Sequence, residues 1–161
     1  STPVVHGGRI YVAIGQSPIH GPGQGALSCL DGATGTLVWE SRQVHRTITD
    51  AVIHEGLVFI ADYSGLLHCL DAATGEHCWQ HDLVGGVWCQ TPCVAHGLVY
   101  IANEKNRLWV FRASREKTLV AQGRARSTPI TPAWQDGILY FPTQHDVSAI
   151  RLAPGAASAA N

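Results

Sequence analysis

The amino-acid sequence repeats itself with a period of 40 residues. Residues 27–39, LSCLDGATGTLVW, recur as residues 67–79, LHCLDAATGEHCW. The two copies carry the same residue types at matching positions: Asp31 and Asp71, Gly35 and Gly75, and Trp39 and Trp79. A fixed period of roughly 20 to 50 residues indicates that one supersecondary unit is stacked several times, as in solenoids and propellers.

A second motif occurs four times, at residues 3–12, 51–60, 92–101 and 132–141. Each copy contains a short apolar stretch, a turn that closes on glycine, and a β-branched or aromatic stretch. This pattern is typical of two antiparallel strands. The first spacing between copies is the longest because residues 16–25 form an insertion rich in glycine and proline. With the polar turns that follow, each unit predicts four antiparallel strands.

We therefore predict an all-β fold, a β-propeller of four-stranded antiparallel blades, with about four blades in this chain. The blades are placed at residues 1–44, 45–85, 86–126 and 127–152. Residues 153–161 form an Ala/Ser tail that we expect to be disordered. A parallel β-helix would need shorter coils, and a β-sandwich gives no reason for the sequence to repeat.

The two motifs together resemble a known repeat. Leu-Asp-x-x-Thr-Gly-x-x-x-Trp, preceded by a Pro-Val-Val-x-x-Gly-x-Val-Tyr-Val strand pair, is similar to the PQQ-like repeat of bacterial quinoprotein dehydrogenases and of their non-catalytic relatives. Those relatives include the propeller lipoprotein of outer-membrane protein assembly and the propellers of bacterial Ser/Thr kinases. The resemblance covers residues 1 to about 152.

The resemblance implies a docking role for the repeated turn, with the tryptophan indole packed between neighbouring blades near the Thr-Gly turn. The docking residues are Asp31, Thr34, Gly35, Trp39, Asp71, Thr74, Gly75 and Trp79. The third and fourth units depart from the pattern, since Arg112 and Arg151 stand where the aspartates are expected. Related propellers resemble closed rings, so we expect an arc that a second copy (a homodimer) or a partner chain completes into about eight blades.

Five cysteines and nine histidines raise the question of a metal or redox site. Cys29, Cys69 and Cys93 occupy repeat positions that hold small apolar residues in other units, so we expect them in the core. A quinoprotein dehydrogenase would resemble a site with adjacent cysteines and a set of calcium ligands, and this sequence has neither. We therefore predict no catalytic residue, no metal site and no cofactor, with PQQ and calcium as the alternative.

Polar residues gather in the loops that join blades and the loops that join second to third strands. In propellers these loops open on one face, where rigid sheets hold them around a central funnel and where binding concentrates. The candidate ligand-binding residues are His20, Arg46, Tyr63, His81, Asp82, Glu104, Arg126, His145 and Asp146. His45 and Asp62 lie in the same loops. His68 and His77 are predicted on outer strands, where they alternate with buried residues.

Composition narrows the classes of partner. Charged residues make up 14% of the chain and the net charge is -1, so no basic field is available for a phosphate backbone and we expect no nucleic-acid partner. No stretch approaches the roughly 20 apolar residues of a membrane helix. We therefore expect no transmembrane segment.

The resulting functional prediction is a non-catalytic binding or scaffold propeller that presents its loop face to a protein or ligand. Two alternatives remain open. One is a fragment of a PQQ-dependent quinoprotein oxidoreductase, and the other is the sensor propeller of a bacterial Ser/Thr kinase or an envelope assembly factor. The family resemblance favours the bacterial periplasm or cell envelope.

Overall fold

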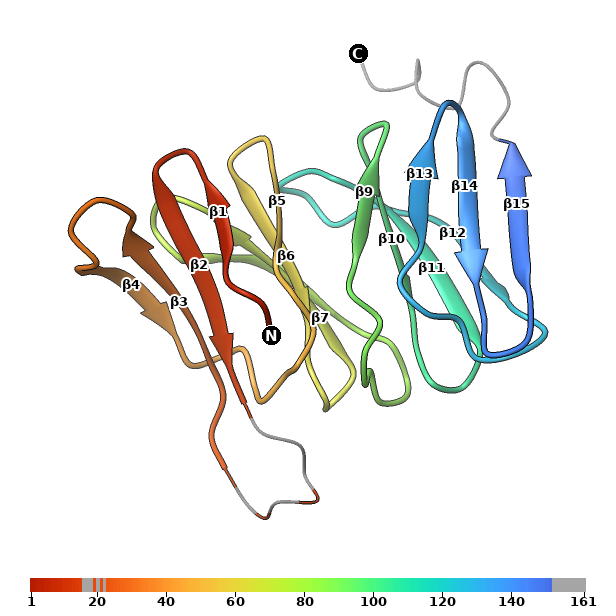
Figure 1. Cartoon of the computed structure of the whole chain (residues 1–161), viewed down its shortest axis with the longest axis horizontal. Coiled ribbons are helices and arrows are strands. Elements are labelled where there is room, and N and C mark those ends of the chain that lie inside the picture. The colour runs from red at the N-terminus through yellow and green to blue at the C-terminus, as the bar shows by residue number, and fades with distance from the viewer. Residues whose placement is uncertain (16–18, 20, 22, 152–161) are drawn as a thin grey trace.

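The structure is a computed structural model that describes residues 1–15, 19, 21 and 23–151. These residues form fifteen strands and no α-helix, arranged as four antiparallel sheets that stand side by side in a row (Figure 1). This arrangement confirms the prediction of an all-β fold with about four propeller blades. The predicted disordered tail, residues 153–161, lies outside the described residues. No helix suited to crossing a membrane occurs in the part of the chain that the structure describes.

Each sheet follows the chain from its first strand to its last. Blade 1 contains β1 (Val4–His6), β2 (Arg9–Ile14), β3 (Ala26–Asp31) and β4 (Leu37–Ser41). Blade 2 contains β5 (Val52–His54), β6 (Leu57–Ala61), β7 (Leu66–Asp71) and β8 (His77–Asp82). Blade 3 contains β9 (Cys93–Ala95), β10 (Leu98–Ala102), β11 (Arg107–Arg112) and β12 (Leu119–Arg124). Blade 4 has three strands among the described residues, β13 (Ala133–Gln135), β14 (Ile138–Pro142) and β15 (Val147–Arg151).

The blades share one strand register. The aromatic residue in the second strand lies opposite a small residue in the third, in the pairs Tyr11–Cys29, Phe59–Cys69, Tyr100–Val110 and Tyr140–Ala149. In blades 1 to 3 the pairing of third and fourth strands shifts by one residue just after that small residue. Equivalent positions therefore face equivalent neighbours, and the contacts of one blade can be compared directly with those of the next.

The connections lie at two ends of the sheets (Figure 1). Turns between first and second strands and between third and fourth strands share one end, because antiparallel strands reverse direction at each turn. The loops between second and third strands, together with the segments that join blades, lie at the opposite end. We call this second end the loop face.

Apolar side chains fill the three layers of contact between neighbouring blades, which we call seams. Tyr11, Cys29 and Trp39 of blade 1 pack against Val58, Ile60 and Leu70 of blade 2 in the first seam. The second seam, between blades 2 and 3, is centred on Phe59, Trp79, Ile101 and Phe111. The third seam brings Tyr100 and Leu98 of blade 3 against Leu139 and Phe141 of blade 4.

Because the second strand of a central blade is covered on both faces, it does not alternate between buried and exposed residues. β6 and β10 are buried at every position. The prediction that His68 alternates with buried residues is therefore wrong, since His68 and its neighbours Leu67 and Cys69 are all fully buried. A period-2 pattern indicates one solvated face, and the inner strands of the central blades have none, whereas the outer strand β12 of blade 3 is exposed throughout.

Candidate functional site

The repeated aspartates organise the turns between third and fourth strands. Asp31 Oδ1 accepts hydrogen bonds from the backbone N–H groups of Ala33 and Thr34 and from the Thr34 hydroxyl, at 3.0 to 3.1 Å. These bonds lower the pKa of Asp31, the Thr34 backbone bond being the strongest cause. Asp71 repeats this arrangement with Ala73 and Thr74. It also accepts a hydrogen bond from Arg115 of blade 3.

The bond from Arg115 is the largest influence on Asp71 and, with the bonds from Thr74 and Ala73, lowers the pKa of this carboxyl to about 2. The Arg115–Asp71 pair therefore links blade 3 to blade 2 at the turn end of the molecule. Its guanidinium group is largely exposed, so the pair fixes the relative position of two turns more than it adds to stability.

The predicted docking residues meet across the first seam. Trp39 Nε1 donates a hydrogen bond to the Ala72 carbonyl oxygen at 3.0 Å, and the Tyr11 hydroxyl donates to the same oxygen at 3.2 Å. A Cβ atom added to Gly75 would come within 2.6 Å of the Trp39 ring. Gly75 also has a φ of +75°, in the region that favours glycine. The indole thus lies directly on the Thr74–Gly75 turn of the next blade.

The docking contact weakens along the chain. In the second seam, Trp79 Nε1 donates a hydrogen bond to the Ser114 carbonyl oxygen at 2.9 Å, and at none of the described glycines is the Trp79 ring among the atoms nearest to an added Cβ. In blade 3, Ala121 occupies the place of the tryptophan, opposite Val110. The third seam therefore forms from the aromatic and aliphatic residues of the second strands, without a tryptophan on the outer strand.

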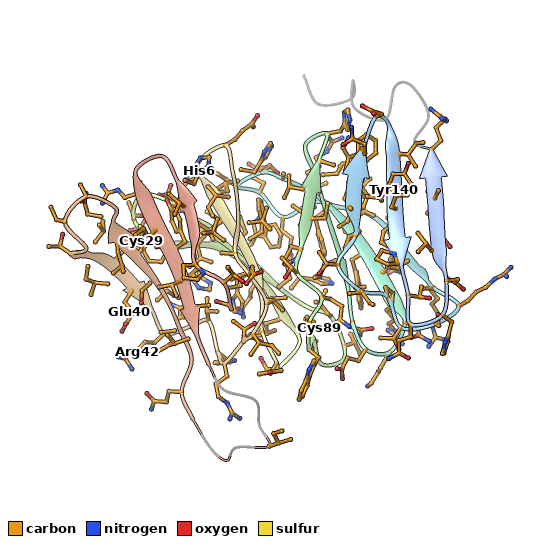
Figure 2. All side chains as sticks on the ribbon, in the orientation of Figure 1. His6, Cys29, Glu40, Arg42, Cys89 and Tyr140 are labelled. Atoms are coloured by element: carbon orange, nitrogen blue, oxygen red, sulfur yellow. The ribbon has the colours of Figure 1, made fainter. Side chains whose placement is uncertain are left out.

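The loop face carries an open cleft between blades 1 and 2 with a volume of about 710 Å³. Its lining comes from the end of the β2–β3 loop, the segment that joins blades 1 and 2, and the β6–β7 turn: Gly23, Gln24, Gly25, Arg42, His45, Arg46, Tyr63 and Ser64. Arg46 Nη1 donates a hydrogen bond to the Gly21 carbonyl oxygen at 2.7 Å, which ties two walls of the cleft together. Figure 2 shows Arg42 beside Glu40, and its Nε lies 2.9 Å from a Glu40 oxygen.

A fully buried carboxylate, Asp62, lies beneath this cleft. Its Oδ2 accepts hydrogen bonds from His68 Nε2 at 2.8 Å and from the His45 backbone N–H at 3.2 Å. Its Oδ1 accepts from the Ser64 hydroxyl and from the Leu66 backbone N–H. Burial, the largest influence, raises the pKa of Asp62, but the hydrogen bonds led by His68 and Ser64 outweigh it and lower the pKa. Asp62 is therefore ionised at neutral pH and accepts from all four donors.

Asn103 has the corresponding position in blade 3. It is also fully buried, its Nδ2 donates to the Leu83 carbonyl oxygen at 2.8 Å, and its Oδ1 accepts from the backbone N–H groups of Lys105 and Arg107. Both residues join a turn between second and third strands to the segment that enters the blade. The most buried polar groups of the loop face thus hold the loops in place, and the exposed groups are left for recognition.

Of the predicted ligand-binding residues, the structure brings together Arg46 and Tyr63, which line the same cleft. Glu104, Arg126, His145 and Asp146 are exposed and come from three separate turns or connections of blades 3 and 4, since His145 and Asp146 share the β14–β15 turn. Asp146 accepts a hydrogen bond from Thr143 within its own turn, and Asp82 accepts one from the Val84 backbone N–H. His20 lies outside the described residues.

The predicted placement of His81 and Asp82 in a loop is wrong. β8 continues to Asp82, so His81 lies on a strand and its ring packs edge-on against Phe111 of blade 3, with centroids 4.8 Å apart. Burial, followed by the charge of Lys117, lowers the pKa of this imidazole. His81 therefore belongs to the second seam rather than to the binding surface.

Sequence reasoning left Arg42 and Ser64 out of the site. Arg42 directly follows β4 and Ser64 sits in a short turn, so neither has a repeat partner that marks it. The sequence contained one signal for the buried polar residues of the loop face. The repeat alignment places Asp62 and Asn103, two residue types that are common in turns, at the same position after a buried strand. The described residues contain no group of three or more histidine, cysteine, aspartate or glutamate side chains that could hold a metal ion.

The stacked sheets, the shared register and the tryptophan contacts define an arc of a propeller built from PQQ-like repeats. The family model described as "Outer membrane protein assembly factor BamB" matches residues 23–159. The chain therefore belongs to this family. Among curated proteins, none has a sequence that matches it.

Solved structures share the fold. BamB from Moraxella catarrhalis superimposes with a TM-score of 0.72 at 12% identity, over 92% of this chain and 41% of that chain. The computationally designed Ika4 protein gives a TM-score of 0.73 at 12% identity, over 94% of this chain and 89% of that one. A europium-containing methanol dehydrogenase gives 0.63 at 16% identity, over 78% and 24%. The chain thus spans about two fifths of the length of this BamB, and at such identities the likeness concerns the fold alone.

Proposed function

We propose that this chain is a non-catalytic scaffold propeller of the cell envelope that binds an acidic segment of a partner protein in the cleft between blades 1 and 2. The observation that carries the proposal is the composition of the cleft. Two guanidinium groups, Arg42 and Arg46, and the imidazole of His45 line it. Glu40, which is not among the lining residues, accepts from Nε of Arg42 at 2.9 Å, so binding relies on the remaining N–H groups of Arg42 and on Arg46. The negative charge of Asp62 lies beneath the surface, where four hydrogen bonds already occupy it.

The shape of the cleft suits an extended peptide. It is open, and its walls are loops held by rigid sheets, which is how propellers present binding residues. The backbone of Gly23 is exposed beside the arginines, since glycine has no side chain to cover it, whereas Gly25 is buried against His45. Arginine is also well suited to bidentate recognition of carboxylates.

The test uses a fluorescein-labelled, glutamate-rich peptide and measures fluorescence polarisation at low and high salt. We expect the wild-type chain to bind it and the double variant Arg42→Gln/Arg46→Gln to bind about tenfold more weakly, because two charge-assisted contacts are lost. Arg107→Gln/Arg124→Gln removes the same charge from a groove on blade 3 and should leave the affinity unchanged. No binding by the wild type, or equal losses in the two double variants, would contradict the proposal.

The residues present do not fit the quinone site of the alternative prediction. All five cysteines are free, no two are adjacent in the sequence, and Cys29 and Cys69 are buried in different seams. We therefore expect that PQQ added with calcium leaves no chromophore on the desalted protein and does not raise its melting temperature. A ligand that binds only the folded state raises the melting temperature, so an increase would favour the oxidoreductase reading.

A further inference from the structure

The two outermost sheet faces, one on blade 1 and one on blade 4, are the feature that the proposed function leaves unexplained. Figure 1 shows blades 1 and 4 at opposite ends of the row, each with one face against a neighbour and one face without any among the described residues. Figure 2 places Tyr140 on blade 4. Both faces carry apolar residues, among them Val5, which is 73% exposed, Ile14 at 52% and Val147 at 67%.

The internal seams show what each face is built to contact. In blades 1 to 3 the aromatic residue of the second strand, Tyr11, Phe59 or Tyr100, points to the next blade and is at most 3% exposed. In blade 4 the same position is Tyr140, in register with the small residue Ala149 as the others are with theirs. Tyr140 is only partly buried, and it faces away from blade 3. The outer face of blade 4 is thus of the kind that packs on a following blade.

The outer face of blade 1 is of the complementary kind. In blades 2 to 4 the residues on either side of the aromatic position point to the preceding blade and are nearly or fully buried: Val58 and Ile60, Val99 and Ile101, and Leu139 and Phe141. In blade 1 the corresponding residues are Ile10 and Val12, which are only half-buried. This face is therefore built to receive a preceding blade.

The turn of blade 1 supports the same reading. Gly35 has a φ of +71°, close to the +75° of Gly75, and each glycine lies four residues after the aspartate of its turn. A Cβ atom on Gly75 would collide with Trp39 of the preceding blade, whereas one on Gly35 would meet no described atom within 4 Å. Blade 1 thus has the same turn as blade 2, with its docking position open.

We propose that a second copy of this chain covers both faces, with blade 4 of each copy packed on blade 1 of the other to close a ring of two chains. The proposed contact between blade 4 and blade 1 has the same arrangement as the three seams within the chain. A twofold-symmetric pair contains this contact twice. Head-to-tail contact of like repeats closes only at a fixed number of copies. Because the chain covers 41% of the BamB chain, two copies come close to supplying one propeller of that size. The third seam shows that such a contact does not need a tryptophan on the outer strand.

The first measurement is the molar mass of the whole chain by light scattering during size exclusion, over a wide range of concentration. We expect twice the chain mass of 17.3 kDa. Val12→Glu and Tyr140→Glu should each weaken the dimer by about tenfold or more, because each buries a charge in a seam. Val120→Glu places the same charge at a 48% exposed site on β12 and should leave the mass unchanged. Circular dichroism establishes that every variant is folded.

Mixing the two destabilised variants tests the orientation. When Val12→Glu pairs with Tyr140→Glu head to tail, one of the two seams is entirely wild type, so the mixture should form more dimer than either variant alone. If blade 1 instead packed on blade 1 of the other copy, Tyr140→Glu would have no effect and mixing would rescue nothing. A folded wild type that stays monomeric at high concentration, or a mixture without rescue, overturns the proposal.

Discussion

Replacing Trp39 with alanine is expected to lower the free energy of unfolding by about 3 to 5 kcal/mol, the usual cost of truncating a buried tryptophan. Trp39 is 8% exposed, and its loss would also leave the Ala72 carbonyl without the indole N–H. The measurement is urea unfolding followed by circular dichroism. Trp88→Ala is the matched control, since Trp88 is 37% exposed in the segment that joins blades 2 and 3 and should cost much less.

Two glycine variants separate the docking contact from the backbone of the turn. Gly35→Ala should cost about 1 to 2 kcal/mol, because alanine is strained at positive φ. Gly75→Ala has the same strain and in addition a collision with the Trp39 ring, so it should cost clearly more. In the Trp39→Ala background the two glycine variants should become equal. If Gly75→Ala is no worse than Gly35→Ala in the wild type, Trp39 does not dock on that turn as described.

The second large effect is expected at Asp62. In Asp62→Asn either orientation of the amide replaces an oxygen that accepts two hydrogen bonds, so two buried donors lose their acceptor. We expect a loss of about 2 to 4 kcal/mol in the free energy of unfolding. Asp136→Asn is the control, because Asp136 is exposed in a turn at a φ of +48° that asparagine tolerates, and it should change stability by less than about 0.5 kcal/mol.

The same variant makes a prediction about pH. The folded-state pKa of Asp62 is lowered, so its stabilising contribution is complete above the pKa of an unfolded aspartate, at about 4. This contribution is lost as the pH falls through the folded value. The stability difference between wild type and Asp62→Asn should therefore be constant near neutral pH and shrink below about pH 4. Asp31 and Asp71 are present in both proteins, so they do not contribute to that difference. A difference that stays constant into acid would contradict the ionised state assigned to Asp62.

The fold could be predicted from the sequence because each blade of a propeller repeats the same residue types at a fixed spacing. Glycines after the first strand, β-branched and aromatic residues in the second, and the Asp-x-x-Thr-Gly turn occur at fixed steps. The period also placed the core cysteines: Cys29 and Cys69 are buried, and Cys93 is partly buried at the third seam. The repeat period did not predict the positions of His68 and His81. Burial and strand ends depend on which sheets lie on either side of a blade, and the local sequence does not contain that information.

The cleft was only partly predictable for a related reason. Arg46 and Tyr63 were expected on the loop face, but the cleft exists because the end of the β2–β3 loop lies beside the segment that joins blades 1 and 2. The bond from Arg46 to the Gly21 carbonyl spans 25 residues. No sequence spacing relates an insertion in one blade to the segment that joins two blades. The positions of Arg42 and Ser64 in the cleft therefore depend on tertiary contacts.

The fading of the tryptophan contact from the first seam to the third has a thermodynamic consequence. In an array of repeats, the free energy of unfolding is approximately the sum of the stability of each repeat and of each interface between neighbours. An end repeat held by a weaker interface is therefore expected to unfold before the others. Blades 1 and 2 are joined at the docking turn by an indole, two hydrogen bonds to one carbonyl and a close-packed glycine. Blades 3 and 4 lack this docked turn and are joined by apolar packing and by the hydrogen bonds that link Cys89, Gln90 and Thr91 to Pro129 and Thr131. The repeats are thus unequal in strength along the chain, so blade 4 is the element most able to open and re-form independently of the other three.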